Sequence, residues 1–297
     1  MTRSFAFLVN PHSGGGAAPE AVVPVARALR DAGAVVDVTY SPGPAAMAAL
    51  VEEAVAAGHV VVSVGGDGML ASLAGLVARA DGVLGIVPAG RGNDFARMLG
   101  IPDDAAGQAR VLLEGTERRV DLLDDGGHLV AGSVYAGVDA RAAAKVDTMK
   151  RIPKPAQYPL GGLWALATYS PGRFRVEVDG VADHYAAATV VVANSAFYGK
   201  GMKIAPGAVV DDGLAEVVIV EAASRWALMR AMPSLYDGSH VTRDEVTVLR
   251  GKRITVAADS PVPVEVGGDG EPLGFLPGLD AEPRVIEVAP GALRILA

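Results

Sequence analysis

Three glycines and one carboxylate follow a β-branched apolar run in the first quarter of the chain. The run His59–Val64 leads directly into Gly65-Gly66-Asp67-Gly68. Glycines at the end of a strand let backbone N–H groups close on phosphate oxygens, and a helix beginning near Met69 would point its positive end the same way. A carboxylate repels a polyphosphate, so Asp67 is expected to bind Mg²⁺ or a water on Mg²⁺. The segment therefore predicts a phosphate site with a metal ligand, and an ordinary glycine-rich turn is the alternative.

Two further glycine-rich segments also follow expected strands. They are Asn10-Pro11-His12-Ser13-Gly14-Gly15-Gly16 and Gly90-Arg91-Gly92-Asn93-Asp94. Ligands of parallel sheets bind at the carboxyl ends of the strands, so all three segments should meet at one crevice. Asn93 and Asp94 can cap the next helix and also face that crevice. The chain has neither a Walker A motif nor GxGxxG, which favours a nucleotide held by backbone amides and Mg²⁺.

The elements that must position these segments change in type near Val120. Before it, short β-branched runs alternate with Ala/Leu segments of helical period, which indicates βαβ units around a parallel sheet. After it, β-rich runs separated by turns indicate an antiparallel sandwich, interrupted by helices over 160–169 and 225–232. The expected strands of the first part are 5–9, 35–39, 60–64 and 83–87, and its helices are 20–32, 44–57 and 69–80. We therefore predict an α/β domain over 1–122 and a β-sandwich domain over 123–285.

Composition narrows the possible functions. The 297 residues include no cysteine, which excludes disulfides and thiolate chemistry and leaves oxygen-bound Mg²⁺ as the expected metal. A net charge of −8 argues against an extended nucleic-acid surface. No run approaches the roughly 20 apolar residues of a membrane span. Met1–Ser4 leads straight into a β-like run without a signal peptide, so we expect a cytoplasmic protein.

Two regions of the second part leave alternatives open. The locally basic stretch 145–155 could touch a membrane surface or be a solvated loop. Apolar residues over 160–169 and 226–235 could line an acyl-chain groove or pack into a core. The turn Asp269-Gly270-Glu271 places two carboxylates after a strand, and by itself it predicts a hairpin turn.

The glycine-rich segments and the acidic turn, taken together, resemble a known family. Their order and spacing are similar to those of the diacylglycerol kinase catalytic family of bacterial lipid kinases, which is related to sphingosine kinases and, more distantly, to NAD kinases. The supporting matches are Val120-Asp121, Tyr198-Gly199-Lys200-Gly201-Met202 and the segment 205–214. The resemblance covers essentially the whole chain. It implies an NAD-kinase-like parallel-sheet nucleotide domain followed by an antiparallel β-sandwich domain, with ATP between them and the final strand, about 286–297, returning to the first domain.

The resemblance also implies roles for individual residues. Around the nucleotide it places Asn10, Pro11, His12, Ser13, Gly14, Gly65, Gly66, Asp67, Gly68, Met69, Leu70 and Asn93. An adenine-side threonine of the family corresponds to Thr39 or to Ser41. Asp67, Asp94 and Asp121 would form an Mg²⁺-linked acidic network. Glu271 would take the proton of the acceptor hydroxyl, with Asp269 as the second candidate. Asp212 and the carbonyls of Val209 and Leu214 resemble a structural Mg²⁺ site, for which a simple Asp-Gly turn is the alternative.

Two positions depart from the family pattern. Met69 and Arg91 stand where members usually carry threonine, so two hydroxyl contacts to the nucleotide are missing. Arg91 could compensate by meeting phosphate directly as a charged fork, or it could face solvent.

The sequence thus predicts an ATP- and Mg²⁺-dependent lipid kinase that phosphorylates diacylglycerol to phosphatidic acid. The alternatives are a sphingoid-base or other long-chain alcohol kinase, a small-metabolite kinase acting on an NAD-like acceptor, and a non-catalytic nucleotide-binding module. The expected partner is a lipid substrate at a membrane surface, met peripherally and transiently at the inner face, with no nucleic acid. A homodimer is an open alternative.

Overall fold

The computed structural model describes residues 3–149, 152 and 154–297. By internal contacts the chain divides into two compact units. Unit 1 comprises the residues up to Leu122 together with Gly199–Gly201 and Ala289–Ala297. Unit 2 comprises Leu123–Tyr198 and Met202–Val288. The chain therefore enters unit 1 three times, and each unit is described by itself below.

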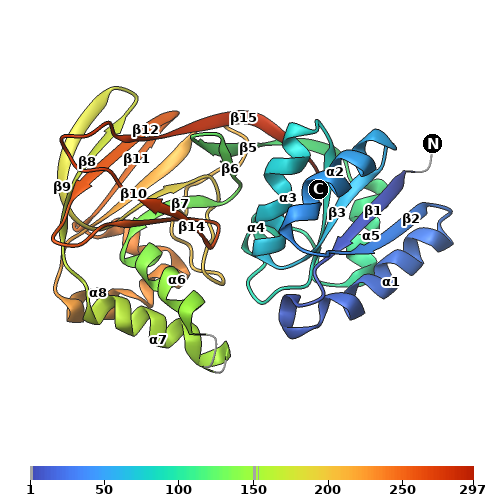
Figure 1. Cartoon of the computed structure of the whole chain (residues 1–297), viewed down its shortest axis with the longest axis horizontal. Coiled ribbons are helices and arrows are strands. Elements are labelled where there is room, and N and C mark those ends of the chain that lie inside the picture. The colour runs from blue at the N-terminus through green and yellow to red at the C-terminus, as the bar shows by residue number, and fades with distance from the viewer. Residues whose placement is uncertain (1–2, 150–151, 153) are drawn as a thin grey trace. The chain divides into compact units, whose positions relative to one another are not determined.

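Unit 1 is built on a parallel sheet in the order β15, β4, β3, β1, β2 (Figure 1). The strands are β1 (Ser4–Val9), β2 (Val35–Tyr40), β3 (Val60–Gly65), β4 (Val83–Pro88) and the end of β15 (Arg284–Leu296). The central strands are buried along nearly their whole length, which explains their continuous β-branched runs. The predicted parallel-sheet architecture is confirmed.

The helices of unit 1 connect these strands. They are η1 (Ser13–Gly15), α1 (Ala18–Asp31), α2 (Pro44–Ala56), α3 (Asp67–Arg79), α4 (Asp94–Met98) and α5 (Ala105–Glu114). Helix α1 packs with α5, and α2 packs with α3. Gly33 and Gly58 follow α1 and α2 with φ of 82° and 74°, as expected for left-handed caps. Phe5, Phe7 and Leu112 are among the fully buried side chains of this core.

Unit 2 is an antiparallel assembly of β-strands, as predicted. Its strands are β5 (Glu117–Asp125, which begins in unit 1), β6 (His128–Val130), β7 (Ser133–Gly137), β8 (Gly172–Val178), β9 (Val181–Ala193), β10 (Ala215–Glu221), β11 (Val246–Gly251), β12 (Arg253–Asp259), β13 (Glu265–Gly268) and β14 (Glu271–Phe275). They run in the order β14, β13, β7, β9, β8, β12, β15, and β10 joins β9 to β11. Phe174, Ile219 and Ile254 are buried at the centre of its core.

The helices of unit 2 correct three details of the sequence prediction. They are α6 (Val138–Thr148), α7 (Lys154–Ala167), α8 (Arg225–Ala231), α9 (Ser234–Asp237) and η2 (Ser239–Thr242). The β-rich run 128–138, whose sequence predicts one strand, breaks into β6 and β7, and its last residue begins α6. Helix α6 was not predicted, and it takes up the first residues of the basic stretch 145–155; Lys150, Arg151 and Pro153 of that stretch lie outside the described residues. Helix α7 begins at Lys154 and ends at Ala167, so it starts before the predicted helix 160–169. On α8, Trp226 and Met229 are exposed whereas Leu228 is half-buried, so core packing does not explain all of its apolar side chains.

Within the part of the chain that the structure describes, no helix is both long and apolar enough to cross a bilayer.

Candidate active site

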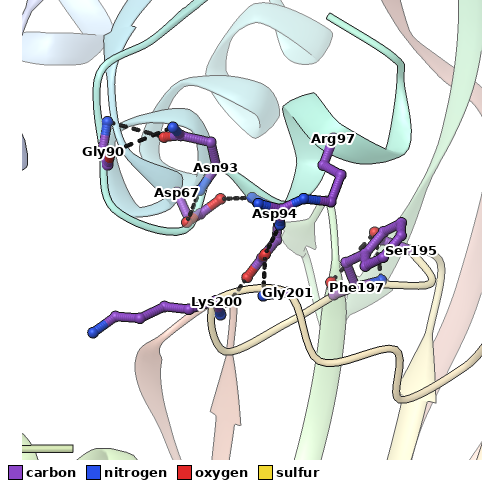
Figure 2. Close-up of polar contacts among 9 residues, drawn as sticks. All are labelled: Asp67, Gly90, Asn93, Asp94, Arg97, Ser195, Phe197, Lys200 and Gly201. Carbon is purple, nitrogen blue, oxygen red and sulfur yellow. Dashed lines mark hydrogen bonds and ion pairs between the residues drawn. The ribbon is translucent and has the colours of Figure 1, made fainter. Parts of the chain in front are cut away.

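Asp67 joins two of the glycine-rich segments at the carboxyl end of the unit 1 sheet. Its Oδ1 accepts a hydrogen bond from the backbone N–H of Asp94 at 2.6 Å, and its Oδ2 accepts one from the N–H of Asn93 at 2.9 Å (Figure 2). These two N–H groups lie at the start of α4, so the Asp67 side chain caps that helix. The predicted meeting of the segments after β3 and β4 is thus present.

Asn93 has a different local role from the one expected. Its Oδ1 accepts from the N–H of Gly90 at 2.9 Å, and its Nδ2 donates to the Gly90 carbonyl at 3.3 Å (Figure 2). The side chain therefore closes the 90–93 turn and does not cap α4. Asn93 adopts φ 54°, a left-handed conformation that asparagine tolerates better than most residues.

Asp94 is buried and accepts three hydrogen bonds from backbone and side-chain donors. Its Oδ2 accepts from the N–H of Lys200 at 2.7 Å, and its Oδ1 accepts from the N–H of Gly201 and from Arg97 Nη1, both at 2.7 Å (Figure 2). Burial raises the pKa of Asp94, the Asp67 charge adds to the rise, and the Lys200 N–H opposes it. The sequence analysis did not assign this role to Lys200 and Gly201. The sequence signal for this role was Gly199-Lys200-Gly201, because two glycines around one residue indicate a turn whose N–H groups are available to bind a carboxylate.

The loop after β1 is closely packed against the loop after β4. Gly14, Gly15 and Gly16 all have positive φ, and a Cβ on Gly14 would lie 2.4 Å from the Ala89 carbonyl oxygen. A glycine is therefore required at position 14. Ser13 Oγ accepts from the N–H of Gly66 at 3.4 Å, which links this loop to the segment after β3.

The remaining predicted residues of this loop serve its shape. Asn10 Oδ1 accepts from the N–H of His12 at 3.0 Å, across Pro11. The succession of left-handed glycines is a backbone conformation of the kind from which anion-binding nests are built.

Two cationic side chains lie over these loops. A Cβ built on Gly15 would lie 3.5 Å from Arg91 Nη2, and one built on Gly92 would lie 3.5 Å from Lys200 Cγ. Burial lowers the pKa of Lys200, and the neighbouring Arg91 charge lowers it further. Lys200 also holds φ 73°, which is unusual for a residue with a side chain. The two cations thus share one region of unit 1; Arg91 is exposed, and its contact with phosphate stays a prediction.

The other residues predicted to contact the nucleotide are placed in the structure as follows. Met69 and Leu70 are buried in α3, and the Met69 side chain packs where a Gly65 Cβ would otherwise lie. Thr39 lies in β2 opposite Leu8. Ser41 Oγ contacts the Met47 sulfur at 3.2 Å and accepts from the Gly43 N–H.

Asp121 connects β5 to the C-terminal strand. Its Oδ1 accepts from the N–H of Gly291 at 2.7 Å. Over the described residues, no group of three or more His, Asp or Glu side chains is arranged to hold a metal ion. The Asp67–Asp94–Asp121 metal network remains a prediction, and the pair that the structure brings together is Asp67 with Asp94.

The acidic turn of unit 2 is a two-residue hairpin connection between β13 and β14, as the local pattern predicted. Asp269 adopts φ 49°, and its carboxylate accepts from the backbone N–H groups of Ala131, Gly132 and Ser133 at 2.9–3.1 Å. Glu271 is exposed, and among the described residues no hydrogen bond or ion pair engages its carboxylate. Asp269 therefore fixes the turn, and Glu271 extends from it.

A series of contacts among aromatic and carboxyl groups connects this turn to Asp139. The Tyr135 hydroxyl accepts from the N–H of Gly270 at 3.1 Å, and the Tyr135 and Tyr198 rings are 5.9 Å apart. The Tyr198 hydroxyl and Thr189 Oγ1 donate to Asp139 Oδ2 at 3.0 and 3.1 Å. Burial raises the pKa of Asp139, although both donors oppose the rise.

At the predicted structural Mg²⁺ site, the Asp212 carboxylate already pairs with an arginine side chain. Asp212 Oδ1 accepts from the N–H of Leu214 at 3.0 Å, and its Oδ2 pairs with Arg250. Glu216 is buried nearby, and its Oε2 has no hydrogen-bond partner in the described part of the chain. Burial raises the pKa of Glu216, and Arg250 opposes the rise. Val209 is partly exposed, and the metal role of this group stays a prediction.

The comparison with protein families agrees with this geometry. Residues 4–124 match the diacylglycerol kinase catalytic domain, and residues 132–297 match the YegS C-terminal NAD kinase beta sandwich-like domain. The chain belongs to the diacylglycerol kinase family. The two matched segments contain the Asp67 loops and the Asp269 turn respectively, and the predicted resemblance is confirmed. As a family member the protein is a lipid-kinase-type phosphotransferase with an alcohol group as acceptor.

Individual relatives extend over nearly the whole chain. A "Diacylglycerol kinase" of Mycobacterium tuberculosis H37Rv is 34% identical over 97% of this chain and 93% of its own length. A "Probable lipid kinase YegS-like" of Pseudomonas aeruginosa PAO1 is 31% identical over 90% of this chain and 86% of its own. The crystal structure of a diacylglycerol kinase of Bacillus anthracis superposes with a TM-score of 0.69 at 18% identity, covering 99% of this chain and 96% of that one. The structural likeness confirms the fold.

Proposed function

We propose that the protein transfers the γ-phosphoryl group of Mg²⁺-ATP to the primary hydroxyl of diacylglycerol, which gives phosphatidic acid. The names of the relatives support diacylglycerol as the acceptor. The observation that carries the proposal is the Asp269–Glu271 turn. A module that only binds nucleotides has no need of a rigidly anchored, unengaged carboxylate, whereas a kinase that acts on a hydroxyl needs a proton acceptor.

The glycine-rich loops of unit 1 suit the phosphate groups of ATP. The left-handed glycines 14–16 present a backbone nest that a single Cβ at Gly14 would disrupt, and Arg91 and Lys200 supply positive charge beside it. Lys200 has a second function, because its backbone N–H holds Asp94 while its side chain points elsewhere (Figure 2). Backbone amides and two cations together match the oxygens of a triphosphate.

The carboxylates of Asp67 and Asp94 suit Mg²⁺ that is also bound by nucleotide. Mg²⁺ in phosphate-transfer sites commonly takes one or two carboxylates and completes its shell with phosphate oxygens and water. Each oxygen of Asp67 accepts one backbone hydrogen bond and retains a lone pair for such a role. The ion would neutralise charge on the phosphates. The N–H bonds from α4 and from 200–201 hold the two carboxylates in place.

Glu271 is the proposed base. As the acceptor oxygen forms its bond to the γ-phosphorus, its proton passes to the Glu271 carboxylate and the bond to ADP breaks. The three N–H bonds to Asp269 and the Tyr135 bond to Gly270 set the position of the turn. Asp269 is the weaker candidate, because both its oxygens are committed to the backbone.

A product analysis tests this function. Wild type, Glu271→Gln and the exposed control Glu282→Gln are incubated with Mg²⁺-ATP and, separately, dispersed diacylglycerol, sphingosine, a long-chain alcohol or NAD. We expect mass spectrometry to find phosphatidic acid with wild type and the control, and a loss of at least 100-fold with Glu271→Gln, within the usual contribution of a general base of about 10²–10⁴-fold. Product from another acceptor alone would replace the substrate assignment. ATP binding without any product would refute catalysis of the proposed kind.

A further inference from the structure

An exposed apolar face stands out on unit 2. On α8 and the residues that follow it, Trp226 is 73% exposed and Tyr236 is 56% exposed, and Met229 and Met232 are also exposed. Trp226 and Met229 lie one turn apart on α8, Met232 follows the end of that helix, and Tyr236 lies on α9. We call this surface, together with Arg225 and Arg230, the α8 face. Large exposed apolar groups clustered in this way mark an interaction surface rather than ordinary scatter.

The charge of the α8 face is opposite to that of the whole chain. The segment 224–237 carries two arginines and one carboxylate, Asp237, so its net charge is +1, whereas the protein has a net charge of −8. Arg225 and Arg230 are exposed, and within the described residues no hydrogen bond or ion pair engages their guanidinium groups. The segment therefore combines an amphipathic aromatic ring, flexible apolar side chains and uncommitted positive charge.

The local structure presents these side chains outward. Ser224 Oγ accepts from the N–H of Ala227 at 3.2 Å and caps α8, so the short helix has a defined start. Leu228 and Leu235 are half-buried on the other side of the segment. The exposed side chains are thus carried by an ordered segment whose opposite side rests on unit 2.

We propose that the α8 face docks the protein on the surface of an anionic phospholipid bilayer. Tryptophan and tyrosine favour the interface between headgroups and acyl chains, and methionine adapts to an irregular apolar surface. Arginines beside them meet lipid phosphates and keep their charge in the headgroup layer. Arg225 and Arg230 outnumber the single carboxylate of the segment, Asp237, so on an acidic protein this surface favours contact with negative charge. The biological use of the docking rests on the proposed function, because diacylglycerol resides in a bilayer.

Vesicle binding tests the docking without relying on catalysis. The intact protein is sedimented with vesicles of phosphatidylcholine plus phosphatidylglycerol and with vesicles of phosphatidylcholine alone. We expect Trp226→Ala to weaken binding to the anionic vesicles at least tenfold. We expect Arg225→Gln/Arg230→Gln to weaken it by about 25-fold, since each arginine contributes about fivefold, or about 1 kcal/mol. The matched controls are Val181→Ser, at another exposed apolar position, and Arg173→Gln/Arg253→Gln, which removes the same charge elsewhere on unit 2.

A fluorescence measurement reports the docked surface directly. The chain has two tryptophans, so Trp164→Phe leaves Trp226 as the single reporter. Brominated phosphatidylglycerol vesicles should quench it. Vesicle binding without quenching, or equal weakening by the control variants, would overturn the proposal. A dimer in solution that Trp226→Ala converts to monomer, with vesicle binding unchanged, would assign the face to a second copy instead.

Kinase assays separate this inference from the proposed function. The α8 variants should retain wild-type turnover of a short-chain, monomeric diacylglycerol and lose turnover of vesicle-embedded diacylglycerol. Turnover of the embedded lipid equal to wild type would contradict the docking role. A wild type that binds anionic vesicles through Trp226 but phosphorylates neither lipid would refute the proposed acceptor and leave the docking intact.

Discussion

Neutralising Asp269 and neutralising Glu271 should have different effects on the protein. In Asp269→Asn, the new Oδ1 can keep the bonds from Gly132 and Ser133, but the amide nitrogen replaces the oxygen that accepts from Ala131 at 2.9 Å. A donor then faces a donor, and the buried Ala131 N–H loses its partner. In Glu271→Gln, the changed side chain is exposed and makes no described contact. The first substitution should therefore act on stability and the second on catalysis.

The size of the stability loss follows from these contacts. An unsatisfied buried N–H costs about 1–3 kcal/mol, and the two remaining bonds weaken because the acceptor is no longer charged. We expect Asp269→Asn to lower the unfolding free energy by about 2–4 kcal/mol, or the unfolding midpoint by about 4–16 °C. The positive φ at this position does not add to the loss, because asparagine tolerates it. Glu271→Gln should change the unfolding free energy by less than about 0.5 kcal/mol.

Thermal unfolding and a kinase assay on the same samples distinguish the roles. Asp269→Asn should retain measurable turnover below its lowered midpoint, and Glu271→Gln should unfold like wild type with turnover almost abolished. The reverse pattern, in which Asp269→Asn unfolds like wild type and loses turnover while Glu271→Gln stays active, would refute the assignment and make Asp269 the base.

Three further predictions concern other charged groups. Arg91→Ala should raise the KM for ATP roughly 10–100-fold, the value of a charge-assisted hydrogen bond, without changing the unfolding midpoint; an unchanged KM would remove Arg91 from the phosphate site. The pKa of Asp139 is raised above its usual 3.8, so the folded protein holds the extra proton and its unfolding free energy should fall as pH rises from 3.8 through the raised value. Urea titrations at several acidic pH values should show that fall in wild type and a smaller one in Asp139→Asn, and equal slopes would contradict it. If Asp212 binds a structural Mg²⁺, nucleotide-free wild type should gain thermal stability from MgCl₂ and Asp212→Asn should not; an equal gain in both would place the ion elsewhere.

The local chemistry of the nucleotide loops could be predicted from the sequence because it depends on adjacent residues. Strand-then-glycine patterns placed Gly65–Gly68 and Gly90–Asp94 at one edge of a parallel sheet, and the Asp67 bonds join them there. The left-handed caps at Gly33 and Gly58 also depend on adjacent residues, because a glycine directly after a helical run favours such a cap. The antiparallel character of unit 2 followed from β-rich runs, and the family resemblance supplied the order of the two folds.

Contacts between distant segments were outside the reach of such patterns. Lys200 and Gly201 hold Asp94 across more than a hundred residues, and Ala131–Ser133 hold Asp269 over a similar separation. No periodicity encodes which backbone N–H groups will face a given carboxylate. Helix α6 was missed for a related reason, since its alanine-rich sequence follows a strand without a turn and begins directly at Val138.

The three-part composition of unit 1 has a consequence for how the protein is made. When the first 122 residues have left the ribosome, the sheet lacks its β15 edge and the buried Asp94 lacks the N–H groups of Lys200 and Gly201. A buried carboxylate without its donors is strongly destabilising, so this segment should not complete its fold alone. The phosphate loops therefore reach their final form only after translation has passed through unit 2 and the last strand has emerged. A prematurely terminated chain would carry the nucleotide-binding sequence in an incompletely folded form that chaperones and proteases can recognise.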